Sequence, residues 1–273
     1  MRTHTTAVAA LGTLVSIAGA VPIDVELDPA RSSIDLSIEV DVGVAADTDS
    51  DTSSLSGYLR VELDDYGNPT MITLHDLGIV IDSDLEFDWS FGFFGGADAS
   101  LTGGGVTWGS TDNIVGPVAV TDGDFVLPDV PVALQGTMFV NYDIFLVGTG
   151  SETLSLADQG DFLSTIEGSV SVDGGTVTVM STLPLDATTP LMDDMGNQLG
   201  TLTVTGTATI VASGSAPSCP ADLTGDGVLD FFDVSAFLSA YSSMDPAADF
   251  DGNGVFDFFD VSAFLGAFSA GCP

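Results

Sequence analysis

The sequence predicts an antiparallel all-β domain, either a sandwich or a barrel, followed by a small α-helical module at the C-terminus. Two patterns support this division. Apolar and polar residues alternate through much of the first 213 residues, and a segment of 21 residues is duplicated near the end. Between them the run VASGSAPS, at 211–218, has the small, proline-bearing composition of a linker. We therefore expect a β domain over 21–213, a linker over 214–218 and a module over 219–273.

The first twenty residues have the order of a secretory signal peptide. Arg2 and His4 precede an apolar stretch from Ala7 to Ala20, which ends in the small-x-small site Ala18-Gly19-Ala20. This stretch is shorter than the roughly 20 apolar residues that span a bilayer. We expect residues 1–20 to be removed on export, leaving a soluble chain that is secreted or extracellular and associated with a cell surface.

Charge narrows the range of partners. The chain has 40 acidic residues, no lysine and only three arginines, Arg2, Arg31 and Arg60, so its net charge is −37. Binding to nucleic acid needs basic clusters, and this composition excludes it. A solvated acidic surface suited to a saline environment is the simplest interpretation of the charge. A hydrophobic content of 45% argues against disorder.

The alternation of apolar and polar residues predicts the strands of the β domain. It is unbroken from Ile34 to Val44 and places six apolar residues on one face. These are Ile34, Leu36, Ile38, Val40, Val42 and Val44. Further strands are expected at Leu55–Leu63, Leu85–Phe93, Val132–Leu146, Ile166–Val172, Thr176–Met180 and Leu202–Ala212. Asp173-Gly174-Gly175 predicts a hairpin turn, and Thr153–Thr165 has room for one short helical turn.

Four strands share a glycine on their apolar face. The segments are LSGYLRV from Leu55, LQGTMFV from Leu134, IEGSVSV from Ile166 and VTGTATI from Val204. A strand that lacks a side chain there can bend sharply or let a facing strand approach, as in barrels and curved sandwiches. The alternative is that these glycines line a ligand cavity.

The duplication predicts two calcium sites. Asp222–Ser242 matches Asp249–Ser269 at 15 of 21 positions with an offset of 27, and each copy opens with a twelve-residue loop. Calcium takes six to eight oxygen ligands, which such loops supply from positions 1, 3, 5, 7, 9 and 12 with glycine at 6. The ligands expected in the first loop are Asp222, Thr224, Asp226, the Val228 carbonyl, Asp230 and Asp233. Those in the second loop are Asp249, Asp251, Asn253, the Val255 carbonyl, Asp257 and Asp260.

The only two cysteines, Cys219 and Cys272, bracket the repeats. An even count in an exported chain predicts a disulfide bond between them. Closing a loop of this length would stabilise the module by roughly 4 kcal/mol. The alternative is two free thiols acting as nucleophile or metal ligand.

Two features separate these loops from an EF-hand. Position 12 is Asp rather than Glu, and proline-containing segments, Ser218-Cys219-Pro220 and Met244-Asp245-Pro246, replace an incoming helix before each loop. A calcium loop followed by one helix, duplicated and closed at its ends, resembles the dockerin family. The Gly271-Cys272 pair resembles a dockerin variant that ends in Gly-Cys. The resemblance covers the C-terminal fifth of the chain.

The resemblance implies a partner. Dockerins bind cohesin modules on a scaffold or cell surface through loop positions 10 and 11 and the helix that follows. In this sequence those positions are Phe231 and Phe232, and Phe258 and Phe259, where other family members carry small polar residues. Because the copies are nearly identical, a half-turn would present almost the same surface, and this predicts two docking orientations.

Helical geometry sorts the aromatic residues of the module. One stripe of the first helix carries Phe231, Val234, Phe237, Leu238 and Tyr241, and the equivalent stripe carries Phe258, Val261, Phe264, Leu265 and Phe268. Both stripes are expected to form the core of the module. Phe232 and Phe259 lie off the stripes and are therefore the better candidates for contact with a partner.

The β domain offers little material for catalysis. His75 is the one histidine after the signal peptide and stands beside Asp76, with no lysine and no cysteine in the domain. Carboxylates are so abundant that no single pair suggests a glycosidase. We predict an ordinary strand residue at His75 and a non-catalytic β domain.

The aromatic run at 85–94 allows two interpretations. Leu85, Phe87, Trp89, Phe91 and Phe93 share one face, Phe94 lies on the other, and Trp108 follows. The strict alternation favours core packing over a sugar-binding platform.

The expected function is therefore calcium-dependent attachment or assembly outside the cell by dockerin–cohesin-type binding. One alternative is a carbohydrate-active protein, either a glycoside hydrolase or a polysaccharide-binding module. It predicts exposed tryptophans or two carboxylates about 5 to 9 Å apart in a cleft. A second alternative is a lipocalin-like ligand carrier, which predicts an apolar cavity of several hundred Å³.

Overall fold

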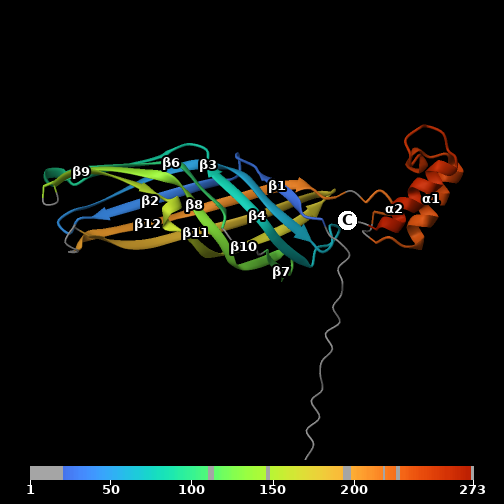
Figure 1. The fold of residues 1–273 in the computed structure, drawn as a ribbon, viewed down its shortest axis with the longest axis horizontal. Coiled ribbons are helices and arrows are strands. Elements are labelled where there is room, and N and C mark those ends of the chain that lie inside the picture. Colours follow the sequence, from blue (N-terminus) through green and yellow to red (C-terminus); the bar gives the residue numbers. More distant parts are fainter. Residues whose placement is uncertain are drawn as a thin grey trace, which may run out of the picture.

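The computed structural model describes residues 21–109, 114–145, 148–192, 198–217, 219–225 and 228–271. The predicted signal peptide over 1–20 lies outside the described residues. The chain forms an elongated β structure followed by a pair of helices beyond one of its ends (Figure 1). A mainly antiparallel β domain with a small helical C-terminal module is confirmed.

The described strands form one twelve-stranded antiparallel sheet. They are β1 (Ile23–Leu27), β2 (Ser33–Asp41), β3 (Ala46–Leu63), β4 (Met71–Ile81), β5 (Leu85–Ser90), β6 (Gly95–Trp108), β7 (Val115–Ala119), β8 (Asp124–Ile144), β9 (Gly148–Ser155), β10 (Asp161–Asp173), β11 (Thr176–Met192) and β12 (Gln198–Ser215). Two 3-10 turns, η1 (Gly92–Phe94) and η2 (Ala157–Gln159), interrupt them. The module contains α1 (Phe231–Ser243), η3 (Pro246–Ala248) and α2 (Phe258–Ala270).

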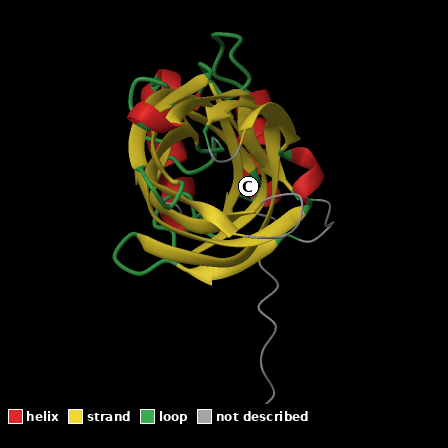
Figure 2. Cartoon of the chain, turned by 90° about the vertical axis from the view of Figure 1, so that its left-hand side faces the viewer, coloured by secondary structure: helices red, strands yellow, loops and turns green. Residues whose placement is uncertain are grey.

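The sheet closes on itself. From β3 the ladders run through β2, β12, β11, β10, β8, β6 and β4, and a ladder between β4 and β3 completes the ring (Figure 2). β1 pairs with both β3 and β12, whereas β5, β7 and β9 extend β6, β4 and β8. A barrel, rather than a sandwich, is therefore the architecture, and closure leaves few edges unpaired.

Most of the predicted strands are present, but the predicted set is incomplete. The hairpin turn is confirmed: Asp173 pairs with Thr176, and both intervening glycines have positive φ angles, 55° and 75° or so being what a type I′ turn requires. The predicted turn within 153–165 is η2. At the end of the domain, β12 continues to Ser215 and so includes the first two residues of the predicted linker.

The strands missed from the sequence are β1, β4, β6, β7 and β9. In β4 the ladder with β3 passes from Arg60–Asp76 to Val61–Leu74, so His75 occupies a bulge that breaks the alternation. β6 reads GGADASLTGGGVTW, and glycine has low strand propensity. In both strands the tertiary pairing outweighs a weak local signal.

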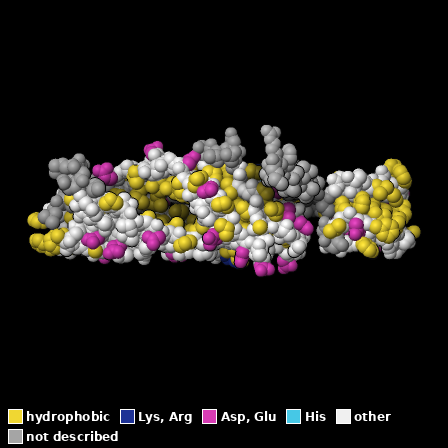
Figure 3. All heavy atoms as spheres, turned by 90° about the horizontal axis from the view of Figure 1, so that it is seen from below, with side chains coloured by type: hydrophobic (Ala, Val, Ile, Leu, Met, Phe, Trp, Pro, Cys, Tyr) yellow, Lys and Arg dark blue, Asp and Glu magenta, His cyan; other side chains and the backbone are white. Residues whose placement is uncertain are grey.

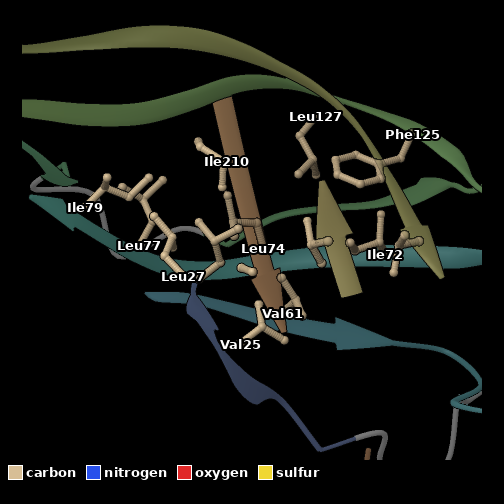
Figure 4. Packing of buried hydrophobic residues seen from close by; sticks show 14 of the residues in the cluster. Val25, Leu27, Val61, Ile72, Leu74, Leu77, Ile79, Phe125, Leu127 and Ile210 are labelled. Atoms are coloured by element: carbon tan, nitrogen blue, oxygen red, sulfur yellow. The ribbon is translucent and has the colours of Figure 1, made fainter. Parts of the chain in front are cut away.

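Two hydrophobic clusters fill the barrel. The first is shown in Figure 4, where side chains from β1, β3, β4, β8 and β12 point toward one another. Its labelled members are Val25, Leu27, Val61, Ile72, Leu74, Leu77, Ile79, Phe125, Leu127 and Ile210. The second cluster contains Ile38, Val40, Val42, Leu85, Phe87, Trp89, Phe91, Ala99, Leu101 and Ile144. Ile34 and Ile81 pack against both clusters and so lie between them.

The aromatic run of β5 belongs to the core. Phe87 and Trp89 stack with ring centroids 5.9 Å apart, and the indole Nε1 of Trp89 donates to the carbonyl oxygen of Ile38 at 2.8 Å. Two residues depart from the predicted faces. Phe93 is exposed because β5 ends at Ser90 and η1 follows, and Val44 is exposed because β2 ends at Asp41.

The four shared glycines stand where strands approach closely. A Cβ at Gly57 would overlap the carbonyl oxygen of Gly78, and one at Gly206 would overlap that of Asp35. At Gly136 a Cβ would lie 2.8 Å from the Cα of Gly104, and at Gly168 it would lie 2.8 Å from the ring of Phe125. None of the four is among the described residues that line the cavity of the barrel. Close approach is thus the correct explanation.

Three aspartates join β3 to β5 where no backbone ladder between these strands is present among the described residues. On alternate positions of β3, one carboxylate oxygen of each accepts a backbone N–H of β5 at 2.8 Å. The pairs are Asp47 with Ser90, Asp49 with Asp88, and Asp51 with Glu86. The other oxygen of each accepts the N–H of the next residue of β3. These carboxylates continue the barrel wall by side-chain bonds.

Replacing Asp47, Asp49 and Asp51 together by alanine should lower the free energy of unfolding by about 2 kcal/mol, since each bond contributes about 0.5–1.5 kcal/mol and lies near the surface. The triple asparagine variant is the matched control, because it removes the same charges but keeps a side-chain acceptor. Urea denaturation followed by tryptophan fluorescence measures the difference. Equal stability of the two variants would show that these bonds contribute nothing.

Candidate metal centre

The two repeats build each helix start from loop residues. At position 9, Asp230 and Asp257 are the N-caps of α1 and α2, and their side chains accept the backbone N–H of Phe232 and Phe259, each at 2.7 Å. In return, the carboxylates at position 12 accept the N–H of the cap residues. This capping box satisfies N–H groups that a helix start leaves without partners. Loop and helix are therefore one structural unit.

The position-12 carboxylates lie at the centre of their loops. Asp233 and Asp260 are fully buried. Oδ1 of Asp260 accepts the N–H groups of Phe250 and Asp251, at 2.8 and 3.3 Å. Oδ1 of Asp233 accepts the N–H and the hydroxyl of Thr224, at 3.1 and 3.0 Å. Each loop thus wraps its backbone around one aspartate.

These hydrogen bonds also set the charge state. The N–H of Asp230, helped by Thr224, lowers the pKa of Asp233 below its ordinary value, although burial acts to raise it. In the second loop the N–H of Asp257 has the same leading effect on the pKa of Asp260. Both groups are consequently ionised at neutral pH, the form in which a carboxylate binds calcium.

The second loop brings three carboxylates together. One oxygen from each of Asp249, Asp251 and Asp260 lies within 4.8 Å of the others. Oδ2 of Asp249 accepts the N–H of Gly254 at 2.9 Å, but its Oδ1 is buried with no hydrogen-bond partner among the described residues. A buried carboxylate oxygen without a partner is costly, and a cation supplies the missing interaction. The residues of this loop therefore fit a calcium ion.

The remaining positions of the second loop are ordered around this cluster. Asp251 accepts both the N–H and the side-chain amide of Asn253, at 3.1 and 2.8 Å. The amide oxygen of Asn253 in turn accepts the N–H of Val255 at 2.7 Å. Positions 3, 5 and 7 are thereby held in one tight turn.

The first loop is described in part. Oδ1 of Asp222 accepts the N–H of Gly225 at 2.8 Å and the hydroxyl of Thr224 at 3.3 Å. The predicted ligand Asp226 lies outside the described residues, so its placement beside Asp222 and Asp233 stays a prediction. Val228, whose carbonyl is the expected position-7 ligand, is exposed, as is its counterpart Val255.

The duplication extends to the interior of the module. The fully buried hydrophobic residues of its core form two pairs at the offset of 27, Ala221 with Ala248 and Phe237 with Phe264. The rings of Phe237 and Phe264 stack with centroids 4.2 Å apart and an interplanar angle of 7°. Phe250 packs edge-on against both. Equivalent residues therefore meet each other, as a pseudo-twofold relation requires.

The predicted helix core is wrong for four residues. Phe231, Leu238, Phe258 and Leu265 were expected to pack inward, but all four are exposed. The buried face is instead centred on Phe237 in α1 and on Phe264 in α2. It includes Asp233 and Asp260, because the loops close over these carboxylates, and a search for the most apolar stripe passes over a charged residue. Of the predicted stripes, Val234, Tyr241, Val261 and Phe268 do pack against the core.

As a result both aromatic residues of each pair face outward. We call Phe231 and Phe232 the first aromatic patch, and Phe258 and Phe259 the second. Their exposed fractions correspond closely, 76% and 66% against 74% and 65%. Hydrophobic side chains gather on the surface of the module in Figure 3. Clusters of large exposed apolar side chains mark interaction sites.

The predicted disulfide lies partly within the described chain. Cys219 is disulfide-bonded. The other cysteine of the sequence, Cys272, lies outside the described residues.

The candidates for chemistry in the β domain are placed apart from one another. Nε2 of His75 lies 2.7 Å from Oε2 of Glu62 on the neighbouring strand. The adjacent Asp76 instead accepts the hydroxyl of Tyr58 at 2.9 Å. Of the two tryptophans, Trp89 is buried and Trp108 packs against the first cluster. The exposed tryptophan row expected of a sugar platform is therefore not formed by these residues.

None of the helices in the described part of the chain is long and apolar enough to cross a membrane. In comparisons with known proteins, no family model, no curated protein and no solved structure matches the chain.

Proposed function

We propose that the C-terminal module attaches this protein to a cohesin-like partner outside the cell, in the manner of a dockerin and in dependence on two bound calcium ions. The β domain is then the displayed, non-catalytic part of a secreted, surface-associated protein. The observation that carries the proposal is the pair of equivalent aromatic patches, each joined directly to a loop of calcium-ligand composition.

Calcium dependence follows from how the loops are connected to the helices. The residues at positions 9 and 12 are at once expected metal ligands and the capping box of the helix. The aromatic patches are the first two helical residues, immediately after the cap. A bound ion offsets the repulsion among Asp249, Asp251 and Asp260 and so holds the helix start, with its patch, in one orientation.

The symmetry of the module supports two docking orientations. Buried residues pair at the offset of 27, and the two patches have nearly the same exposure. A partner that binds one patch in one orientation meets the other patch after a half-turn. Either patch alone then suffices for binding.

The carbohydrate-active alternative has less support. It depends on exposed tryptophans or on a defined carboxylate pair, and Trp89 lies in the core with its indole N–H bonded to Ile38. The attachment proposal does not depend on any group of the β domain.

The test uses the full chain as bait against the cell-envelope and culture fractions of its native source, with calcium or with a chelator. The variants are Phe231→Ala/Phe232→Ala, Phe258→Ala/Phe259→Ala and all four changes combined. We expect each double variant to retain capture of the same partner, and both the quadruple variant and the chelator to abolish it. Phe145→Ala, at a similarly exposed phenylalanine of the barrel, is the matched control.

Capture that is indifferent to the chelator would contradict calcium-dependent docking. Loss of binding in a single double variant would contradict the two orientations while leaving the docking surface in place. Circular dichroism of each variant with calcium checks that the helices remain folded.

A further inference from the structure

The barrel encloses a cavity of about 540 Å³. Its lining comes from all eight strands of the closed ring, and it includes Ile34 and Ile81, which pack against both hydrophobic clusters. The cavity therefore lies between the two clusters, in the middle of the barrel. We propose that it binds an uncharged, predominantly aliphatic lipid, which enters sideways between β10 and β11. This goes beyond the attachment function and does not depend on it.

The size and lining of the cavity point to an apolar ligand. Protein interiors are normally close-packed, and few voids exceed the size of a water molecule. Leucine, isoleucine and valine side chains from every side dominate this lining, among them Leu36, Leu59, Leu77, Ile79 and Leu134. Apolar cavities exclude water and take up apolar molecules, and small-molecule sites have volumes of about 300–1,000 Å³. The cavity matches what the ligand-carrier alternative predicted.

An opening is built into the wall where two strands separate. The ladder between β10 and β11 extends only from Gly168–Ser181 to Asp173–Thr176. Beyond it, β11 continues to Met192 paired with β12, while β10 is paired with β8. The lining residues on the two strands past this point are Phe162, Ser164, Thr165, Ile166 and Glu167 of β10, and Thr182, Leu183, Pro184 and Leu185 of β11. The separation of these strands leaves the cavity a lateral mouth.

Two further features keep this mouth open and apolar. Pro184 of β11 has no N–H to donate to a neighbouring strand, and proline is typical of strand edges that stay unpaired. At the rim, Phe162 and Leu163 are exposed. Figure 3, which views the molecule from below, shows a hollow lined with hydrophobic side chains in the face of the barrel. A lipid can reach the cavity here without the ends of the barrel opening.

The charges restrict the headgroup. Among the described lining residues none is basic, and Glu167 stands at the mouth. Of the arginines, Arg60 pairs with Asp24 at 3.8 Å and is not part of the lining. A carboxylate or phosphate headgroup would find no counter-ion, and a chain with a net charge of −37 repels it. Hydroxyl groups of Ser164, Thr165 and Thr182 are available at the mouth for a neutral polar end.

A matched pair of probes tests the proposal on the full chain. Retinol and retinoic acid share one skeleton and differ in charge, and quenching of tryptophan fluorescence reports the binding of either. We expect saturable one-to-one binding of retinol, with retinoic acid bound about ten-fold more weakly at neutral pH. Hexadecanol should displace retinol, and hexadecanoic acid should do so much less well. Addition of a chelator should leave these affinities unchanged.

Two variants locate the site. Ala208→Phe places a large side chain in the cavity and should weaken retinol binding at least about ten-fold. Thr182→Lys places a cation at the mouth and should bring the affinity for retinoic acid close to that for retinol, a gain that misfolding cannot produce. Thr188→Lys, an exposed position on the same strand outside the lining, is the control and should change neither affinity.

Three results would overturn the proposal. They are the absence of saturable retinol binding by the unmodified chain, equal binding of the alcohol and the acid, and an equal response to Thr182→Lys and Thr188→Lys. If Ala208→Phe does not fold, the comparison of the two lysine variants still decides the location of the site.

Discussion

Replacing Asp249 and Asp251 together by asparagine should remove calcium binding from the second loop and leave one site in the chain. Asp249 has a buried Oδ1 without a partner, and it shares its cluster with Asp251 and Asp260. The affinity of such loops depends strongly on the number of charged ligands, so the loss of two carboxylates should weaken binding by about 100-fold or more. Asparagine keeps one acceptor for the N–H of Gly254, so the turn itself need not open.

Isothermal titration calorimetry on the full chain measures this as a change in stoichiometry from two ions to one. Asp245→Asn is the control, because Asp245 caps η3 outside both loops and should leave two sites. Binding of two ions by the Asp249→Asn/Asp251→Asn variant, or of none by the unmodified chain, would contradict the assignment.

Gly57→Ala should destabilise the barrel by about 3 kcal/mol or more. Gly57 has φ 132°, and a Cβ there would overlap the carbonyl oxygen of Gly78 on β4. The collision is with backbone, which cannot move aside without separating β3 from β4. That ladder closes the ring of strands, so the cost falls on the architecture of the whole barrel.

Gly174→Ala is the matched control for Gly57→Ala. Gly174 also has a positive φ, 55°, but a Cβ there would meet nothing within 4 Å. It should cost only about 1–2 kcal/mol for the left-handed conformation. Chemical denaturation of both variants separates the collision from the conformational cost. Equal losses would show that close approach of β3 and β4 is not what requires Gly57.

The parts of the fold predicted well are those whose signal is local. Regular alternation identified the strand that carries Ile38 and Val40, because side chains of a strand alternate between two faces. The turn at Gly174 and Gly175 was predictable because type I′ turns need positive φ at both central residues. The strands β4 and β6 were missed because a bulge at His75 and a run of glycines obscure that periodicity.

The candidate metal centre shows the same division. The ligand spacing is a property of twelve consecutive residues, and three of the predicted ligands of the second loop do converge. The outward placement of Phe231 and Phe258 was not predicted, since it depends on loops that bury Asp233 and Asp260 against the helices. Hydrophobicity along a helix does not reveal that a carboxylate occupies the buried face.

The sequence by itself determined that this chain is an acidic β domain joined to a duplicated pair of calcium-ligand loops, because composition, alternation and repeats are all readable in consecutive residues. Only the tertiary structure decided that the β domain closes into a barrel, that β10 and β11 separate beside Pro184, and that a cavity of about 540 Å³ lies within. Closure and cavity depend on pairings between strands far apart in the chain, and no local pattern specifies which strands meet or how much space they leave.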